Sequence, residues 1–159
     1  MALAFRNLDA SPDDPAQTWP FEGVLTALER GGLPQWRRLA RAIGDRPWGQ
    51  VARYVEQAVA VAHPIGVAEV MTDLTVSARR DAETAERAEV AAEVREPVSR
   101  SGRTQGQFAS DIGTSSSRLS TYASGVAVPS SALLVRMRRT ARWTAQGDGA
   151  SEGTRPSPF

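Results

Sequence analysis

Apolar residues recur every three or four positions through most of residues 19–142, and this period limits the fold more than any other feature of the chain. The clearest run is Phe21, Val24, Leu25 and Leu28. Such a spacing places the apolar side chains on one face of an α-helix, and the alternation that a half-buried strand needs is not sustained anywhere. We therefore expect an all-α fold.

Gly and Pro residues divide the N-terminal part of the chain into short helices. A first helix is expected at about 19–30, where Gly31 and Gly32 follow. A second helix should begin near Pro34 and end near Gly44, since Pro suits a first turn and Gly a C-terminus. Asp45 is the expected cap of a third helix, which should end at His63. These helices, with the start of a fourth, predict a bundle over residues 18–76, and the expected core anchors are Trp19, Trp36 and Trp48.

The fourth helix is expected to continue as a connecting helix over residues 77–96, a segment rich in the strong helix formers Ala, Glu and Arg. Its apolar residues are mostly Ala, so it can bury little surface alone. It either lies across the first three helices, pairs with a copy of itself or acts as a stiff spacer. Residues 1–17 are interpreted as a mobile leader, and residues 144–159, rich in Gly, Ser and Pro, as a disordered tail.

The sequence lacks the residues and motifs that several classes of function require. The 159-residue chain has no Cys and a single His, His63, so we expect no disulfide, no thiolate chemistry and no metal centre. A Gly-rich phosphate loop is also absent, and we expect neither enzymatic activity nor a cofactor. Because the sequence has no long apolar run and no secretory signal at its start, we expect no membrane partner and a cytoplasmic location.

The charge of the chain is distributed unevenly along its length. The formal net charge is only +1. Residues 1–96 hold 11 Arg against 15 acidic residues, whereas residues 97–142 hold seven Arg and only one acidic residue, Asp111. A locally basic segment is typical of a protein that binds a polyanion.

The basic segment contains a pair of short helices that begin with hydroxyl residues. Thr104 is the expected N-cap of the first, which places Phe108 and Ile112 on one face before Gly113. Ser115 is the expected cap of the second, in which Leu119 and Tyr122 are apolar and after which Gly125 follows. Two short helices joined by a tight turn have the geometry of a helix-turn-helix.

The stretch "TQGQFASDIGTSSSRLSTYASGVAVPSSALLVRM" resembles the helix-turn-helix of the lambda-repressor, Cro and Xre-type regulators. The matching residues are Thr104, Gln105, Phe108, Ala109, Ile112, Gly113, Ser115, Leu119, Gly125, Pro129 and Ser130. The resemblance covers about 94–142 and implies a five-helix DNA-binding domain over 97–143. Three features depart from the family pattern: Pro97 within the first helix, Arg103 in place of an apolar residue, and the apolar "VAV" after Gly125.

The resemblance also implies a role for individual side chains. In this family the second helix of the motif, here about Ser115 to Ser124, enters the major groove. Carried over by position, the base-contacting residues are Ser116, Ser117, Arg118 and Thr121, and the phosphate-contacting residues are Thr104, Gln105, Ser115, Ser124 and Arg139. Short hydroxyls discriminate poorly among bases, so only modest direct specificity is expected.

Two functions are consistent with this segment. The first is a sequence-specific regulator that binds double-stranded DNA as a homodimer, because one recognition helix covers too few base pairs to select a site. The second is an antitoxin or adaptor whose N-terminal half binds a partner protein while the helix-turn-helix regulates its own operon.

Overall fold

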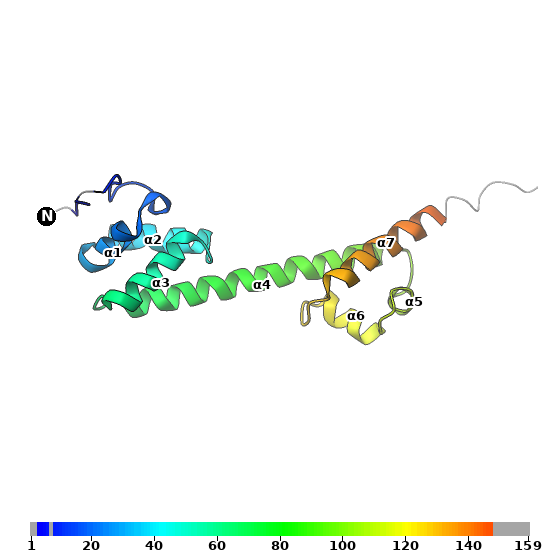
Figure 1. Ribbon diagram of the computed structural model, residues 1–159. Helices are drawn as coiled ribbons and strands as arrows, with labels where there is room; N and C mark the ends of the chain where they lie inside the picture. The colour runs from blue at the N-terminus through cyan, green and yellow to red at the C-terminus, as the bar shows by residue number, and fades with distance from the viewer. Residues whose placement is uncertain (1–2, 7, 148–159) are drawn as a thin grey trace, which may run out of the picture. The chain divides into compact units, whose positions relative to one another are not determined.

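A computed structural model describes residues 3–6 and 8–147 of the chain. Every regular element in this part is helical and none is a strand, which confirms the all-α prediction (Figure 1). The elements are η1 (Ala16–Thr18), α1 (Phe21–Arg30), α2 (Leu33–Asp45), α3 (Gln50–Ala62), α4 (Ala68–Arg100), α5 (Gln105–Asp111), α6 (Ser116–Ala123) and α7 (Ser131–Gly147).

Contacts within the chain divide it into two units, residues 1–83 and 84–159. Helix α4 crosses this boundary and contributes to both cores: Met71 belongs to the N-terminal core and Val94 to the C-terminal one.

The N-terminal unit packs α1, α2, α3 and the first part of α4 around an aliphatic core. The stripes predicted for the first helices face this core, as Val24, Leu39 and Val55 are buried. Trp19 is buried as expected, but Trp48 is 45% exposed, so its assignment as a core anchor was wrong. Trp48 belongs to the turn that precedes α3, outside the helical period that would have directed it inward.

The third helix begins later than the sequence predicted. Gly49, not Asp45, is the N-cap of α3, and Asp45 is the last residue of α2. A turn closed by the Gly49 N–H donating to the Arg46 carbonyl at 2.8 Å separates the two helices. Pro47 has no N–H to extend the hydrogen bonds of α2 and disfavours a helical backbone at Arg46, so α2 ends before it.

The segment predicted to be a mobile leader makes defined contacts where it is described. Phe5 meets the Trp19 ring edge to face, with ring centroids 5.3 Å apart. The Trp19 indole N–H donates to the Ser11 carbonyl at 2.9 Å. Gly23 has no side chain, and this leaves room for the Phe5 ring over α1. Aromatic packing, which the weak periodicity of this segment did not reveal, therefore joins it to the bundle.

Arg79 links α4 to α3 within the N-terminal unit. Its guanidinium donates to both carboxylate oxygens of Glu56, at 2.6 and 3.0 Å, and to the Pro47 carbonyl at 3.1 Å. The hydrogen bond to Glu56 raises the pKa of Arg79. Bidentate pairing of this kind fixes orientation as well as adding energy.

Replacing Arg79 with Ala should therefore lower the free energy of unfolding by about 1–2 kcal/mol, the range for a partly exposed charged hydrogen-bond pair with an additional backbone contact. Urea denaturation followed by circular dichroism measures this change. The matched control is Arg53→Ala on the exposed surface of α3, for which we expect a change within about 0.5 kcal/mol. Equal effects of the two substitutions would contradict the assigned role of Arg79.

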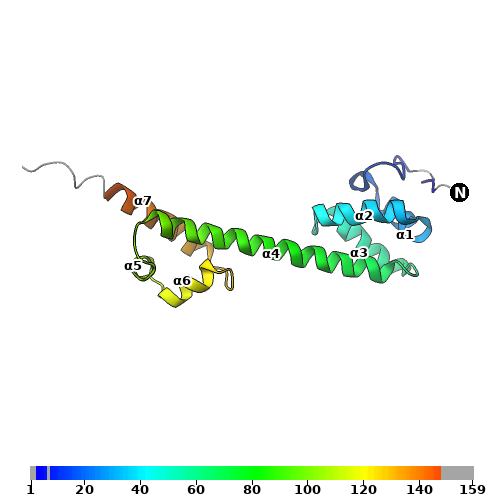
Figure 2. The same ribbon diagram turned by 180° about the vertical axis from the view of Figure 1, so that it is seen from behind.

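The C-terminal unit packs the end of α4 with α5, α6 and α7, and α5 and α6 follow one another on the same side of α4 in both views (Figures 1 and 2). From Thr84 onward the described residues form four helical segments, one fewer than expected. Residues 124–130, which contain Pro129, form turns and irregular chain between α6 and α7. The core consists mainly of Val94, Phe108, Ala109, Ile112, Leu119, Met137 and Ala141.

The ends of α4 and α7 also differ from the sequence-based boundaries. No helix begins at Pro97: α4 passes through this residue and ends at Arg100. Pro97 lies within the last turn of α4, where its missing N–H removes a single hydrogen bond. Helix α7 continues to Gly147, beyond the predicted boundary at residue 143. Residues 148–159, most of the predicted disordered tail, lie outside the described residues.

Candidate nucleic-acid interface

Helix α5 begins with the cap that the sequence predicted. The Thr104 hydroxyl oxygen accepts from the Gln107 backbone N–H at 3.3 Å, and the Gln107 side chain accepts from the Thr104 backbone N–H at 3.1 Å. This reciprocal capping box satisfies two donors that an α-helix leaves unpaired at its start. Phe108 and Ala109 are buried and attach α5 to the core of the unit.

A glycine turn joins α5 to α6. Gly113 has φ +73°, a left-handed conformation that only Gly adopts without strain. Ile112 is the C-cap of α5, and its carbonyl accepts a hydrogen bond at 2.7 Å from the Arg136 guanidinium of α7. A Cβ at position 113 would lie 3.3 Å from this guanidinium. The turn is therefore shaped both by its own backbone and by a side chain from α7.

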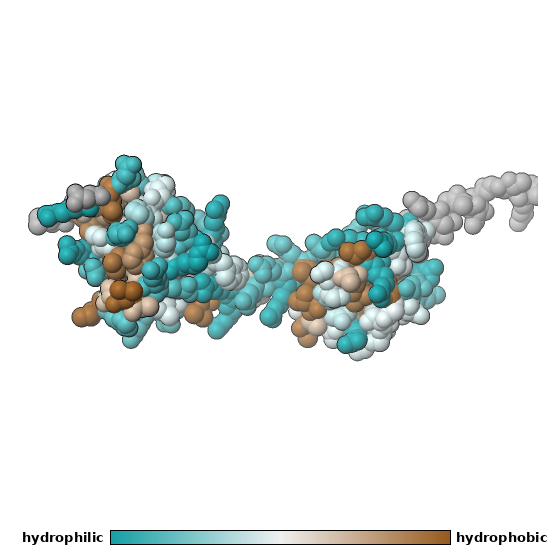
Figure 3. Space-filling view, viewed as in Figure 1, coloured by the Kyte–Doolittle hydropathy of each residue, from teal (hydrophilic) through white to brown (hydrophobic). Residues whose placement is uncertain are grey.

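Helix α6 is anchored by its cap and by one apolar side chain. The Ser115 hydroxyl oxygen accepts from the Arg118 backbone N–H at 3.2 Å, which confirms the predicted N-cap. Leu119 is fully buried, whereas Tyr122 is half-buried. Most of the remaining surface of α6 faces solvent, and Figure 3 shows it as pale, the colour of residues of intermediate hydropathy.

The residues predicted to contact bases fall into two groups. Ser116, Ser117 and Arg118 are exposed, and within the described residues their side chains form no hydrogen bond or ion pair. Thr121 is half-buried, and its hydroxyl donates to the Arg118 carbonyl at 2.8 Å. The Thr121 oxygen can still accept a hydrogen bond, but its proton is used inside the helix. The first turn of α6 therefore carries the unengaged side chains.

Four residues predicted to contact phosphates already make local hydrogen bonds. Thr104 and Ser115 cap their helices through their hydroxyl oxygens. The Ser124 hydroxyl donates to the Thr121 carbonyl at 3.1 Å. The Gln105 amide lies 3.5 Å from the Ser116 carbonyl and links the starts of α5 and α6. These side chains shape the two helices whether or not they meet a ligand.

A hollow of about 420 Å³ brings two of these residues together. Gln105 and Ser124 line it from α5 and from the end of α6. The remaining lining residues are Arg95, Val98, Ser99, Leu119, Ser120 and Ala123. The hollow thus combines hydroxyl, amide and guanidinium groups, all of which can donate hydrogen bonds to an anion.

Arg95 is a candidate that sequence reasoning missed. Its guanidinium donates to the Ala123 carbonyl, the last residue of α6, at 2.6 Å. A guanidinium has five N–H donors, so this contact leaves others available. Arg95 had been assigned to the connecting helix. The resemblance to the family began at residue 94, and that boundary was the signal that could have included Arg95 in the domain.

Ion pairs engage part of the basic charge of this unit. Arg100 pairs with Glu96 at 2.7 Å, Arg103 with Asp111 at 2.8 Å, and Arg138 with Glu93 at 2.5 Å. The pairing with Asp111 gives the exposed Arg103 side chain a partner within the unit. Within residues 97–142, the exposed arginines without an ion pair or side-chain hydrogen bond are Arg118, Arg139 and Arg142. These three are the most available for a polyanion.

The described residues contain no group of three or more His, Asp or Glu side chains placed to hold a metal ion. No helix among them combines the length and apolar character needed to cross a bilayer.

Comparison with known proteins finds no family model, no curated protein and no solved structure that matches this chain.

Proposed function

We propose that the C-terminal unit binds double-stranded DNA and that α6 enters the major groove, as in a sequence-specific transcriptional regulator of the Xre type. The observation that carries this proposal is the first turn of α6. Its three residues Ser116, Ser117 and Arg118 are exposed with unengaged side chains, while Leu119 and the Ser115 cap hold the helix in place. A rigid helix whose first turn carries polar side chains without hydrogen-bond partners suits the major groove, where the base edges carry donors and acceptors.

Arg118 is the main candidate for direct base reading in this proposal. Its guanidinium can donate two parallel hydrogen bonds to the O6 and N7 atoms of guanine, the commonest specific contact in the major groove. Ser116 and Ser117 can donate or accept at either base edge and so add less discrimination. Thr121, whose proton is used within α6, would contribute as an acceptor or through its methyl group.

Backbone contacts would orient α6 in the groove. Arg95, Gln105 and Ser124 surround one hollow beside α6, which suits a phosphate oxygen. Arg139 on α7 is exposed and without an ion pair among the described residues, so it would supply a further phosphate contact. Such contacts fix register and contribute salt-dependent affinity, but they carry little sequence information.

The alternative, an antitoxin or adaptor, uses the same DNA contacts and differs in the role of the N-terminal unit. Its distinguishing result is a partner protein that co-purifies with the chain in a fixed stoichiometry and leaves DNA binding by the C-terminal unit intact.

The direct test is fluorescence anisotropy with the full chain and labelled duplexes at physiological salt. Genomic fragments, including the region upstream of its own gene, are compared with a random duplex of equal length. We expect at least one fragment to bind about a thousandfold more tightly than the random duplex, the lower end for specific regulators. Uniform affinity across all fragments would refute sequence-specific regulation.

Two neighbouring arginines on α7 offer a matched test of the phosphate contacts. Arg139→Ala should weaken binding to all duplexes by a similar factor and reduce the slope of log affinity against log salt by about one, because one counterion fewer is released. Arg138→Ala removes the same charge from a side chain that already pairs with Glu93, so it should change the slope much less. Anisotropy titrations between low and physiological salt measure both slopes, and identical slopes for the two variants would exclude Arg139 as a phosphate contact.

A further inference from the structure

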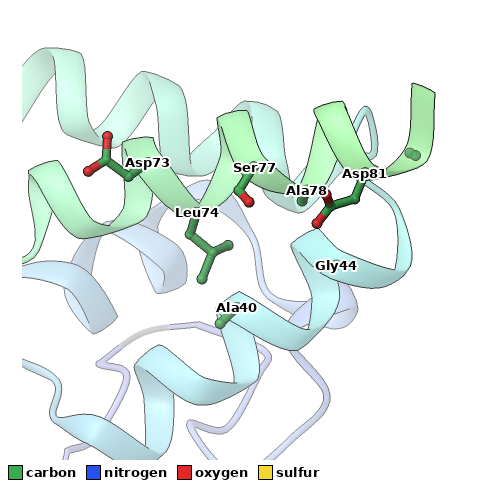
Figure 4. Close-up of a pocket in the computed structure, with 8 residues that line it drawn as sticks. Ala40, Gly44, Asp73, Leu74, Ser77, Ala78 and Asp81 are labelled. Atoms are coloured by element: carbon green, nitrogen blue, oxygen red, sulfur yellow. The ribbon is translucent and has the colours of Figure 1, made fainter. Parts of the chain in front are cut away.

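The N-terminal unit contains a groove that the proposed DNA contacts do not use. It runs between α2 and the first part of α4 and consists of two adjoining hollows of about 600 and 180 Å³. Ala40 and Leu74 line both hollows. Figure 4 shows Leu74 pointing from α4 toward Ala40 on α2. We call this feature the α2/α4 groove.

One end of the α2/α4 groove is almost wholly apolar. Leu33, Trp36 and Met71 line it together with Val70. Leu33 is 55% exposed and Val70 is 57% exposed, although both are large aliphatic side chains. Their exposure beside a hollow is unfavourable in water, and a clustered apolar patch of this kind is typical of a protein–protein interface.

Small residues line the other end of the groove. Ala40 and Gly44 come from α2, and Ala78 comes from α4 (Figure 4). Ala82, also on α4, lines the same end. A Cβ at Gly44 would meet no atom within 4 Å. Another helix could therefore approach this end closely.

The two walls of the groove carry opposite charges. On α2, Arg37 lines the groove and Arg41 follows it one turn later on the same side of the helix. On α4, Asp73 and Asp81 line the groove. All four side chains belong to exposed residues, and none forms an ion pair within the described part of the chain.

We propose that the α2/α4 groove is the interface through which a second copy of this chain binds, with a two-fold axis running along the groove. Rotation about such an axis places the α2 wall of one copy against the α4 wall of the other, and the apolar ends meet. Arg37 and Arg41 then face Asp73 and Asp81 of the second copy, twice in each dimer. This pairing is reciprocal, as a two-fold interface requires.

The charge pattern is what identifies the occupant. A helix from another protein would have to present acidic residues to one wall and basic residues to the other, at the spacing of this groove. A second copy already carries both sets, the arginines on α2 and the aspartates on α4. The proposal rests on the N-terminal unit alone and does not depend on DNA binding.

The experiment uses two charge-reversal variants of the full chain in the absence of DNA. In Arg37→Glu/Arg41→Glu both walls are acidic, and in Asp73→Arg/Asp81→Arg both walls are basic. Sedimentation velocity should show a dimer for the wild type. Because like charges then face each other across the interface, each variant alone should dimerise at least about a hundredfold more weakly.

An equimolar mixture of the two variants is the decisive measurement, because each wall then meets a wall of opposite charge. The mixture should form a heterodimer while neither variant forms a homodimer. Arg53→Glu, a reversal on α3 outside the groove, is the matched control and should dimerise like the wild type. Circular dichroism establishes that each variant is folded. A monomeric wild type, variants that still dimerise alone, or a mixture that stays monomeric would each overturn the proposal, whatever the outcome of the DNA-binding test.

Discussion

Replacing Phe108 with Ala is expected to destabilise the C-terminal unit by about 3–5 kcal/mol, the usual cost of removing a fully buried aromatic side chain. Phe108 is completely buried in a small core with Ile112, Leu119 and Met137. A core of this size has few other side chains that could shift to fill the resulting cavity. Because typical domains are stable by only about 5–15 kcal/mol, the substitution should unfold much of this unit near physiological temperature.

Urea denaturation followed by circular dichroism tests this prediction, and the two units of the chain should be fitted as separate transitions. Only the transition of the C-terminal unit should move. Val126→Ala is the matched control, because Val126 belongs to the same unit and is 77% exposed. Its effect should remain within about 0.5 kcal/mol. If Phe108→Ala were equally mild, Phe108 could not be the centre of this core.

The sequence was most informative where structure depends on neighbouring residues. The starts of α5 and α6 were predicted from Thr104 and Ser115 because a cap acts on an N–H only two or three residues away. The end of α5 was predicted from Gly113, whose positive φ is a local property. The same locality explains why the apolar stripe of α1 could be assigned from its period alone.

Features that depend on distant residues were missed or misjudged. Arg95 meets the end of α6, 28 positions along the chain, and no local pattern indicates that contact. Phe5 packs on Trp19 although its segment has no helical period. Trp48 was placed in the core as the first residue of the apolar stripe of the third helix, yet it lies in the turn before that helix and is exposed. Caps and periods thus predicted which helices form, but not which side chains meet across them.

In the candidate site too, features set by neighbouring residues were predicted and features set by distant residues were not. The unengaged side chains of Ser116, Ser117 and Arg118 follow from their positions in the first turn of a capped helix, which the sequence placed correctly. The basic charge of residues 97–142 could also be counted from the sequence. The sequence did not indicate that ion pairs engage part of this charge. Glu93 and Glu96, which pair with Arg138 and Arg100, lie outside that segment and were counted with the acidic half of the chain.

Arg118→Ala is expected to weaken binding to the preferred duplex by about 10- to 100-fold, the equivalent of about 1–3 kcal/mol for loss of one bidentate base contact. Binding to random duplex should fall much less, so the ratio of specific to non-specific affinity should decrease. Discrimination should relax at a single base-pair position, because one guanidinium reads one guanine. Anisotropy titrations with a set of single-base variants of the preferred site measure both effects.

Arg100→Ala is the control for this experiment, since it also removes one positive charge from the C-terminal unit but from a side chain paired with Glu96. It should weaken all duplexes slightly and leave the base preference unchanged. The Arg118 side chain is exposed and makes no contact within the described residues that would stabilise α6, so Arg118→Ala should also leave the melting temperature unchanged. A fall in stability without a change in base preference would assign Arg118 a structural role and would remove the main specific contact from the proposed recognition helix.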